Sequence, residues 1–405
     1  MMQPKLDNTQ LYKRNITLLY VLSILAGLSF IYDPILTLYY QSFKMNYLQV
    51  SLTLITTSIF IIIFEAPSGA FADLYGKKKS TIIGAILAIV HYLIQFLSTG
   101  FIMFLVANVF WGISVTFFSG ALIAFLHDTL KSLGKEDAFV KYNSRYEGTI
   151  LGITILTGFL GPFVFYINKR LPFLFSLLFG TIYLIICFFL HETETRTVKQ
   201  YSIREHYRQM KEGFIFISRK KGLLWLVFFS IIGIIVSRVV GVIVNSPYII
   251  EIGFSLQYLG WIGLVGTSIQ VLFILLTPKL EKLVGKKFTF VLIVFGIGGL
   301  LLLLLLVTNF LIAIIFGFFW GIISFNDIII QNHLTLQTTK DNRATVISIH
   351  SMMLAIYGII LLPVFGLLTD ITSLAITILI LAGMVLVLGP VFLLARKGIP
   401  TKKQS

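Results

Sequence analysis

The sequence predicts an all-α integral membrane protein whose twelve transmembrane helices form two pseudo-symmetric six-helix bundles. Three observations carry this prediction. The chain of 405 residues is 57% hydrophobic and only 12% charged, with a mean hydropathy of +0.94, which is far from the composition of a soluble globular protein. Its apolar residues are gathered in long continuous runs, and two short motifs recur at one fixed offset along the chain.

The apolar runs are long enough to cross a bilayer, because about 20 residues of helix span a hydrocarbon core about 30 Å thick. Lipid offers no hydrogen bonds to a bare backbone, so spans must be helices or a closed barrel. The runs are continuously apolar and lack the alternation of barrel strands. The twelve expected helices cover residues 15–40, 48–71, 79–99, 101–127, 146–167, 171–190, 222–248, 256–277, 287–307, 310–333, 343–368 and 372–395.

The repeated motifs indicate an internal duplication. Gly76-Lys77-Lys78 recurs as Gly285-Lys286-Lys287, and Phe110-Trp111-Gly112-Ile113 recurs as Phe319-Trp320-Gly321-Ile322, in both cases 209 residues later. Two unrelated features that share one offset point to a duplicated unit. The expected organisation is an N-terminal six-helix bundle, a cytoplasmic linker and a C-terminal six-helix bundle, over residues 1–190, 191–221 and 222–405.

The linker is polar, but some of its apolar residues recur at helical spacing. We expect an amphipathic helix that lies in the membrane interface. A solvated connection whose apolar residues are incidental is the alternative. The residues that carry the pattern are Ile203, Tyr207, Met210, Phe214 and Ile217.

The basic residues report membrane orientation rather than nucleic-acid binding, although the formal net charge is +15. If the loops alternate between the two sides, all but four of the 32 Lys and Arg residues fall on the side of both termini. Lys44, Lys169 and Arg170 lie on the other side, and Arg238 lies inside a span. This asymmetry follows the positive-inside rule. It predicts a multi-pass protein of the cell membrane with cytoplasmic termini that attract anionic lipids.

The loop after the second span combines glycines, an acid and lysines. Gly69 lets neighbouring helices approach closely, and Asp73 is placed to accept N–H groups at a helix N-terminus. Gly76 supplies a tight turn, while Lys77 and Lys78 anchor the loop to the inner surface. We interpret the loop as a gating element. The alternative is a plain hairpin whose lysines only follow the orientation rule.

These five residues resemble the signature loop of the major facilitator superfamily, G-x-x-x-D-x-x-G-[RK]-[RK]. Within that superfamily, three further stretches are similar to bacterial drug/proton antiporters: Glu65–Gly69, Ala124–Leu130 and Arg343–Ser348. The resemblance covers nearly the whole chain. It implies the major facilitator fold and transport by alternating access around a site near the middle of the membrane.

Two features depart from the pattern of proton-coupled members. Asn108 stands where such members commonly carry an arginine in span four. The antiporter motif of span five survives in part, as Gly148, Gly152, Gly158, Gly161 and Pro162.

Charged residues at bilayer depth are costly, so they usually face a cavity or a partner. The candidates for coupling or substrate binding are Asp33, Glu65, Arg238 and Asp327. Asp33 and Arg238 lie at similar depth in the first span of each half, and we hypothesise that they pair to close the outer gate. Separate partners, or a contact with substrate, are the alternative.

Aromatic residues make up 14% of the chain, and most of them must face lipid or fill contacts between helices. Trp111 and Trp320 differ, because they repeat at equivalent positions. We expect them to line or close the central cavity, together with Asn108. An apolar aromatic cavity with few polar groups suits amphiphilic substrates.

Other classes of protein lack support in the sequence. The string from Gly69 to Lys78 has six residues between its glycines and no Ser or Thr after Lys77, so it is not the phosphate-binding loop of an ATP-driven pump. The histidines show no spacing typical of a metal site. We therefore expect neither an enzyme nor a cofactor or a metal.

The predicted function is secondary active transport by a monomer that moves a small molecule. Proton-coupled efflux of small amphiphilic compounds or drugs is the favoured reaction, with protons as coupling ion, membrane lipids as surroundings and no nucleic-acid partner. Solute uptake by a symporter, or lipid flipping on the same fold, is the alternative that the sequence leaves open.

Overall fold

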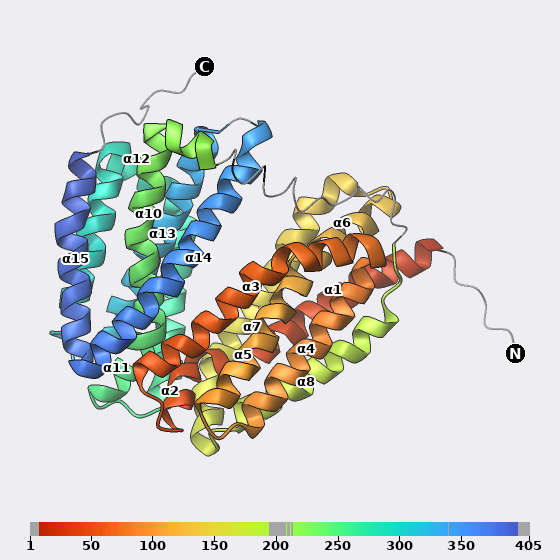
Figure 1. The fold of residues 1–405 in the computed structure, drawn as a ribbon, viewed down its shortest axis with the longest axis horizontal. Coiled ribbons are helices and arrows are strands. Elements are labelled where there is room, and N and C mark those ends of the chain that lie inside the picture. The colour runs from red at the N-terminus through yellow and green to blue at the C-terminus, as the bar shows by residue number, and fades with distance from the viewer. Residues whose placement is uncertain (1–7, 194–207, 209–210, 212–213, 339, 396–405) are drawn as a thin grey trace, which may run out of the picture. The chain divides into compact units, whose positions relative to one another are not determined.

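The computed structural model describes residues 8–193, 208, 211, 214–338 and 340–395. These residues are almost entirely helical (Figure 1). The chain divides into two compact units. Unit 1 comprises residues 1–45 and 52–201, and unit 2 comprises residues 46–51 and 202–405. Residues 46–51 are grouped with unit 2 by their contacts. Within that unit the backbone N–H groups of Tyr47 and Leu48 donate hydrogen bonds to the carboxylate of Asp370.

Unit 1 contains six long helical segments, several of which are interrupted. A 3₁₀ turn around Pro34 breaks the first segment, and Gly120 divides the fourth. The elements are α1 (Asn8–Ser29), η1 (Phe30–Ile35), α2 (Leu36–Gln41), α3 (Tyr47–Tyr75), α4 (Lys77–Leu97), α5 (Phe101–Ser119), α6 (Ala121–Ser132), η2 (Glu136–Ala138), α7 (Phe139–Ile167) and α8 (Leu171–Phe189).

Unit 2 repeats the succession of apolar helices. Its first segment contains a short π-helix, and its second and third expected spans join in one element across Gly285, whose backbone is not helical. The elements are α10 (Lys221–Val239), η3 (Val240–Val244), α11 (Asn245–Glu251), α12 (Tyr258–Leu304), α13 (Ile312–Leu336), α14 (Lys340–Ile371) and α15 (Leu374–Leu394).

The predicted fold class is confirmed. Eleven helices in the described ranges are long and apolar enough to cross a membrane, and the shorter apolar helix Phe288–Leu304 occupies the position of the ninth expected span. The expected amphipathic helix of the linker falls largely on residues 194–207, 209–210 and 212–213, which lie outside the described residues.

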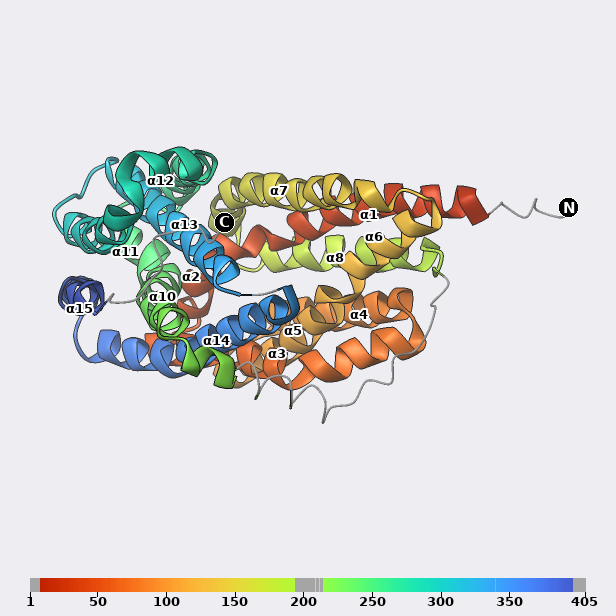
Figure 2. The ribbon, with the colours of Figure 1, turned by 90° about the horizontal axis from the view of Figure 1, so that it is seen from above.

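The helices of unit 1 form two layers around a hydrophobic core. In one layer α1 lies between α7 and α8, and α4 and α5 lie in the other together with most of α3 (Figure 2). Buried side chains of α1, α4, α6, α7 and α8 form one core cluster with Leu190, which directly follows α8: Leu19, Leu22, Leu25, Ala85, Phe125, Leu126, Leu130, Tyr146, Tyr183, Cys187 and Leu190.

The duplicated Trp-Gly motif occupies the same kind of position in each unit. A Cβ atom added at Gly112 of α5 would lie 2.6 Å from the carbonyl oxygen of Thr57 in α3. At Gly321 of α13 it would lie 2.6 Å from the ring of Phe273 in α12. In both units a glycine in the fourth span therefore allows close contact with the second span, as small residues do in membrane proteins.

Candidate functional site

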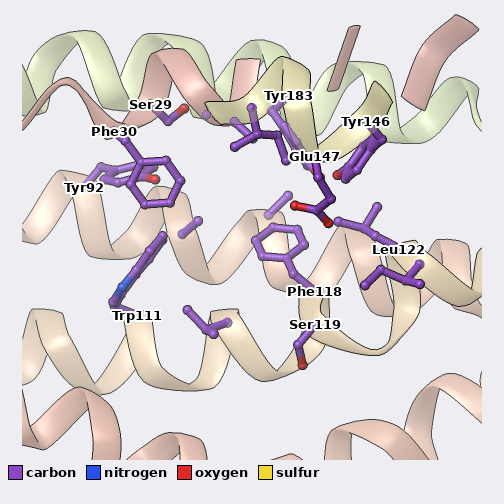
Figure 3. Close-up of a pocket in the computed structure, with 17 residues that line it drawn as sticks. Ser29, Phe30, Tyr92, Trp111, Phe118, Ser119, Leu122, Tyr146, Glu147 and Tyr183 are labelled. Carbon is purple, nitrogen blue, oxygen red and sulfur yellow. The ribbon is translucent and has the colours of Figure 1, made fainter. Parts of the chain in front are cut away.

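Unit 1 contains a cavity of about 440 Å³ that is open on one side. Figure 3 shows the 17 residues that line it. They come from α1, η1, α4, α5, α6, α7 and α8, and all but a few are apolar or aromatic: Ala26, Ser29, Phe30, Ala85, Ala88, Tyr92, Trp111, Val115, Phe118, Ser119, Leu122, Ile123, Tyr146, Glu147, Ile150, Gly180 and Tyr183.

Helical spacing explains why these residues meet. Ala85, Ala88 and Tyr92 follow one another at intervals of three and four residues along α4, so they share one face of that helix. Trp111, Val115 and Phe118 do the same on α5, and each lines the cavity. The alanines contribute only a methyl group, and Gly180 of α8 contributes none. These small residues leave the space that the longer aromatic side chains surround.

Aromatic rings contact one another at one end of the cavity. Trp111 meets Phe30 edge to face, with 6.0 Å between ring centroids, and lies 5.9 Å from Tyr92. His91 packs behind Trp111 at 5.1 Å, and its Nδ1 lies 2.9 Å from the carbonyl oxygen of Ala107. These contacts fix the indole ring in the wall.

Glu147 is the one carboxylate among the lining residues. Its side chain is exposed and extends into the cavity, with the ring of Phe118 and the hydroxyl end of Tyr146 on either side (Figure 3). Within the part of the chain that the structure describes, its carboxylate forms neither a hydrogen bond nor an ion pair. The side chains around this carboxylate are largely apolar or aromatic.

The sequence analysis did not name Glu147 among the charged residues within spans, although it is the second residue of the predicted span 146–167. The helix in fact begins at Phe139, so Glu147 lies in its third turn. A signal was present, since Phe139, Tyr142, Tyr146 and Ile150 recur at helical spacing through a polar segment, and these four residues belong to the core cluster or pack on it. The apolar face continues into the segment that looks like a loop.

Asn108 lies in a buried polar cluster and is not one of the residues that line the cavity. Its Oδ1 accepts a hydrogen bond from Thr57 at 2.9 Å, and its Nδ2 donates to Tyr40 at 3.0 Å and to the carbonyl oxygen of Phe104 at 2.9 Å. Gln95 also donates to the Tyr40 hydroxyl, at 2.9 Å. Asn108 and Gln95 thus meet at the Tyr40 hydroxyl, and the cluster joins α2, α3, α4 and α5.

The four charges predicted within spans lie elsewhere. Asp33 is in η1 and Glu65 in α3 of unit 1, while Arg238 is in the last turn of α10 and Asp327 in α13 of unit 2. Their side chains are exposed, and none of them lines the cavity of unit 1. Asp327 accepts a hydrogen bond of 3.4 Å from Asn326. Pairing of Asp33 with Arg238 stays a prediction.

Trp111 and Trp320 have different surroundings. Trp111 lines the cavity of unit 1. Trp320 packs against Phe319, with 5.3 Å between ring centroids, and lies over Gly241 of η3. A role for Trp320 in a substrate cavity remains an expectation.

The signature loop is held by residues far away in the sequence. Helix α3 continues to Tyr75, so Asp73 lies in its last turn with an exposed side chain, rather than at a helix N-terminus as the sequence analysis expects. The acid at the N-terminus of α4 is Glu192. Its carboxylate accepts hydrogen bonds from the backbone N–H groups of Lys77 at 3.1 Å and Lys78 at 3.0 Å.

The lysine side chains add two contacts within unit 1. The ammonium group of Lys77 pairs with Asp128 of α6, which belongs to the stretch similar to antiporters. Lys78 donates to the carbonyl oxygen of Phe188 at 2.8 Å, near the end of α8. Gly69 lies in α3, where an added Cβ atom would meet no described atom within 4 Å. The loop thus ties α3, α4, α6 and the end of α8 together.

Comparison with known proteins settles the family. Residues 18–326 and 235–405 match the description of the Major Facilitator Superfamily. The chain belongs to this superfamily. It is therefore a multi-pass membrane protein, and family and fold together assign it as a secondary transporter rather than an enzyme.

Several relatives of the superfamily resemble the chain. The uncharacterized MFS-type transporter YxaM of Bacillus subtilis (strain 168) is 27% identical over 283 residues, which cover 67% of this chain and 68% of that protein. The fold resembles that of the nucleoside transporter NupG, with a TM-score of 0.78, 15% identity and coverage of 96% and 99%. It also resembles a D-xylose-proton symporter, with a TM-score of 0.69, 14% identity and coverage of 96% and 99%.

In this superfamily member, the half-buried Glu192, which accepts hydrogen bonds from the signature loop, is expected to make stability depend on pH. Burial raises the pKa of the Glu192 carboxyl, an effect that the N–H groups and charges of Lys78 and Lys77 partly oppose. A raised pKa means that the folded protein favours the protonated acid. The protonated Glu192 therefore contributes its full stabilisation of the folded protein at pH values below the ordinary glutamate pKa of about 4.3. This contribution is lost as the pH rises through the raised pKa of Glu192.

Thermal unfolding of the detergent-solubilised protein over a range of pH checks this expectation. The Tm of the wild type relative to Glu192→Gln should fall as pH rises above the ordinary glutamate range and then stay level. Asp137→Asn, an exposed acid of η2, is the control and should show no such trend. If the Tm of the wild type relative to Glu192→Gln rises with pH instead, the contacts of Lys77 and Lys78 stabilise the ionised carboxylate by more than burial destabilises it.

Proposed function

We propose that the protein exports small amphiphilic compounds in exchange for protons, by alternating access of the cavity in unit 1 to the two sides of the membrane. Both termini are cytoplasmic in this proposal, as the distribution of Lys and Arg predicts. The observation that carries it is the aromatic cavity with a single carboxylate, Glu147.

The lining chemistry favours an amphiphile over a sugar or a nucleoside. Apolar and aromatic walls with a few polar groups bind molecules that have an apolar body. The polar side-chain groups of this cavity are the hydroxyls of two serines and three tyrosines, the indole N–H of Trp111 and one carboxylate. A sugar, which carries hydroxyls all round, would leave most of them without hydrogen bonds in such a site.

The proton requires a group that can change its charge during the cycle. Acids at membrane depth are typical members of proton pathways in transporters. Glu147 qualifies by position, since it lies inside the cavity. Asp33, Glu65 and Asp327 remain candidates for further steps.

Inverted membrane vesicles with an acidified lumen test the proposal. Addition of amphiphilic compounds should make the lumen more alkaline, because each substrate that enters exchanges for a proton. Sugars and nucleosides should have little effect. Alkalinisation by a sugar or nucleoside alone would indicate an exchanger for another class of substrate. Proton movement in the same direction as the substrate would indicate a symporter. Movement of a labelled lipid alone would indicate a flippase.

Removal of the indole ring in the cavity wall should weaken substrate binding. Trp111→Ala loses aromatic contacts worth about 0.5–1.5 kcal/mol, so the KM for an amphiphile should rise up to about tenfold. Trp261→Ala is the control, because Trp261 lies in α12 and is 48% exposed. An equal change of KM in the two variants would show that the substrate does not bind in the cavity of unit 1.

A further inference from the structure

Three loops of unit 1 meet at the end of its helices that lies opposite to the N-terminus. They are the connections after its first, third and fifth spans: residues 42–45, 98–100 and 168–170. The ammonium group of Lys169 donates to the carbonyl oxygen of Ser42 at 3.1 Å. The guanidinium group of Arg170 donates to the carbonyl oxygen of Ser98 at 3.2 Å. The two cations of the last loop therefore contact both of the other loops.

Phe43 brings these two cations together. Nζ of Lys169 lies 3.8 Å from the centre of the Phe43 ring, and Cζ of Arg170 lies 5.7 Å from it. An aromatic ring attracts cations within about 6 Å of its centre. The ring meets Tyr39 and Phe104 edge to face, with 5.2 Å and 5.3 Å between ring centroids. Two positive charges thus share one ring whose position is fixed by packing.

No acid of these loops balances the positive charges. None of the three loops contains Asp or Glu. Within the described residues, neither Lys169 nor Arg170 forms an ion pair, and neither does the exposed Lys44 next to Phe43. Like charges at one ring repel each other, so an anion bound between them lowers the energy. The sequence places these cations on the side that carries few of them, so the positive-inside rule does not account for them.

The side chains next to the cations are apolar and exposed. Tyr166 and Ile167 end α7 just before the third loop, and Leu174 and Phe175 lie near the start of α8. Exposed apolar surface of this kind is typical of contact with a membrane. A phospholipid carries a phosphate group next to its acyl chains, which matches cations at helix ends that are followed by apolar surface. A soluble anion would contact the cations alone.

We propose that Phe43, Lys44, Lys169 and Arg170, which we name the Phe43 cluster, bind the headgroup of an anionic phospholipid. The phosphate lies between the ammonium and guanidinium groups, both of which have more N–H donors than their contacts with Ser42 and Ser98 use. The acyl chains follow the exposed sides of α7 and α8. The lipid joins the ends of the first, third and fifth spans, and its binding does not depend on the transported substrate.

A photoactivatable phosphatidylglycerol tests the proposal on the wild-type protein in mixed-lipid vesicles. With a diazirine in the acyl chain near the headgroup, it should label residues 166–175. Unlabelled phosphatidylglycerol should compete at least about tenfold better than phosphatidylcholine, because each cation near an anionic lipid surface raises affinity by about a factor of five. Soluble glycerol phosphate should not compete.

Three double variants connect the label to the cations. Lys169→Gln with Arg170→Gln should lose most of the label at residues 166–175. Lys169→Arg with Arg170→Lys keeps both charges and should retain it. Lys131→Gln with Lys135→Gln removes two exposed cations from the other end of unit 1, and its labelling at residues 166–175 should match the wild type.

The lipid comparison uses the wild type, so it decides the question even if a variant does not fold. Equal competition by phosphatidylglycerol and phosphatidylcholine would overturn the proposal. Full labelling of a folded Lys169→Gln, Arg170→Gln variant would do the same, because the lipid would then bind without the cations. Competition by glycerol phosphate would also overturn it and would indicate a site for a soluble anion.

Discussion

Replacing Gly76 with alanine is expected to destabilise unit 1 and abolish transport. Gly76 has φ 101° and ψ 151°, a backbone region that is essentially restricted to glycine, and another residue there costs about 1–3 kcal/mol. A Cβ atom would also lie 2.5 Å from Oε2 of Glu192. The carboxylate would have to leave the first turn of α4, so strain and loss of the cap add together. Thermal unfolding in detergent and flux in vesicles measure the two effects.

Gly69→Ala is the matched control, because it lies in the same signature loop and in helical backbone with open space around it. It should leave Tm unchanged or slightly raised, since alanine is favoured in a helix by about 1 kcal/mol. The double variant Gly76→Ala with Glu192→Ala removes the steric clash but keeps the backbone strain, so it should recover part of the lost Tm. A normal Tm for Gly76→Ala alone would show that the loop adopts a different backbone conformation at residue 76.

Gly161→Ala should be nearly as damaging, for a purely steric reason. A Cβ atom there would clash with the carbonyl oxygen of Ile31 and lie 3.1 Å from Cγ of Pro34. A backbone carbonyl cannot rotate away as a side chain can. Helix α7 and η1 would therefore have to separate, at a cost of about 1–3 kcal/mol. Phe30, which begins η1 and lines the cavity, would move with it.

Gly158 offers a control one turn earlier on the same helix. A Cβ atom at Gly158 meets no described atom within 4 Å, so Gly158→Ala should be neutral or raise Tm through helix propensity. We expect the Tm to fall in Gly161→Ala and to stay level or rise in Gly158→Ala. The substrate KM should rise in Gly161→Ala alone. If both variants behave alike, η1 does not pack on α7 as closely as the structure shows.

The spans could be predicted because hydrophobicity alone determines them. A lipid-exposed run such as 171–190 must be apolar along its length, and the structure has a helix over Leu171–Phe189. Helix ends outside the hydrocarbon obey other rules. Polar residues are tolerated there, so α7 begins at Phe139, well before its predicted start, and α3 continues to Tyr75. At Gly285 the backbone is not helical, so the eighth and ninth expected spans are two helices that meet at a kink.

The site was harder to predict because it depends on tertiary contacts. Trp111 was found through the repeat, and the structure places it in the cavity wall. Glu147 was missed because a charged residue near a helix end looks solvated. Glu192 lies 115 residues from Lys77, and no local pattern connects an acid after the sixth span with the first turn of the third. Only the packing of α4 against α8 brings them together.

The Glu192 cap also has a mechanical consequence. Unit 1 ends a few residues after Glu192, and from there the chain runs on towards unit 2. Asn15 holds the adjacent His191 through two hydrogen bonds of 2.8 Å, one in each direction. The connection therefore starts from a point anchored to both α1 and α4. Tension along it would therefore be transmitted to the first turn of α4, and so to the signature loop.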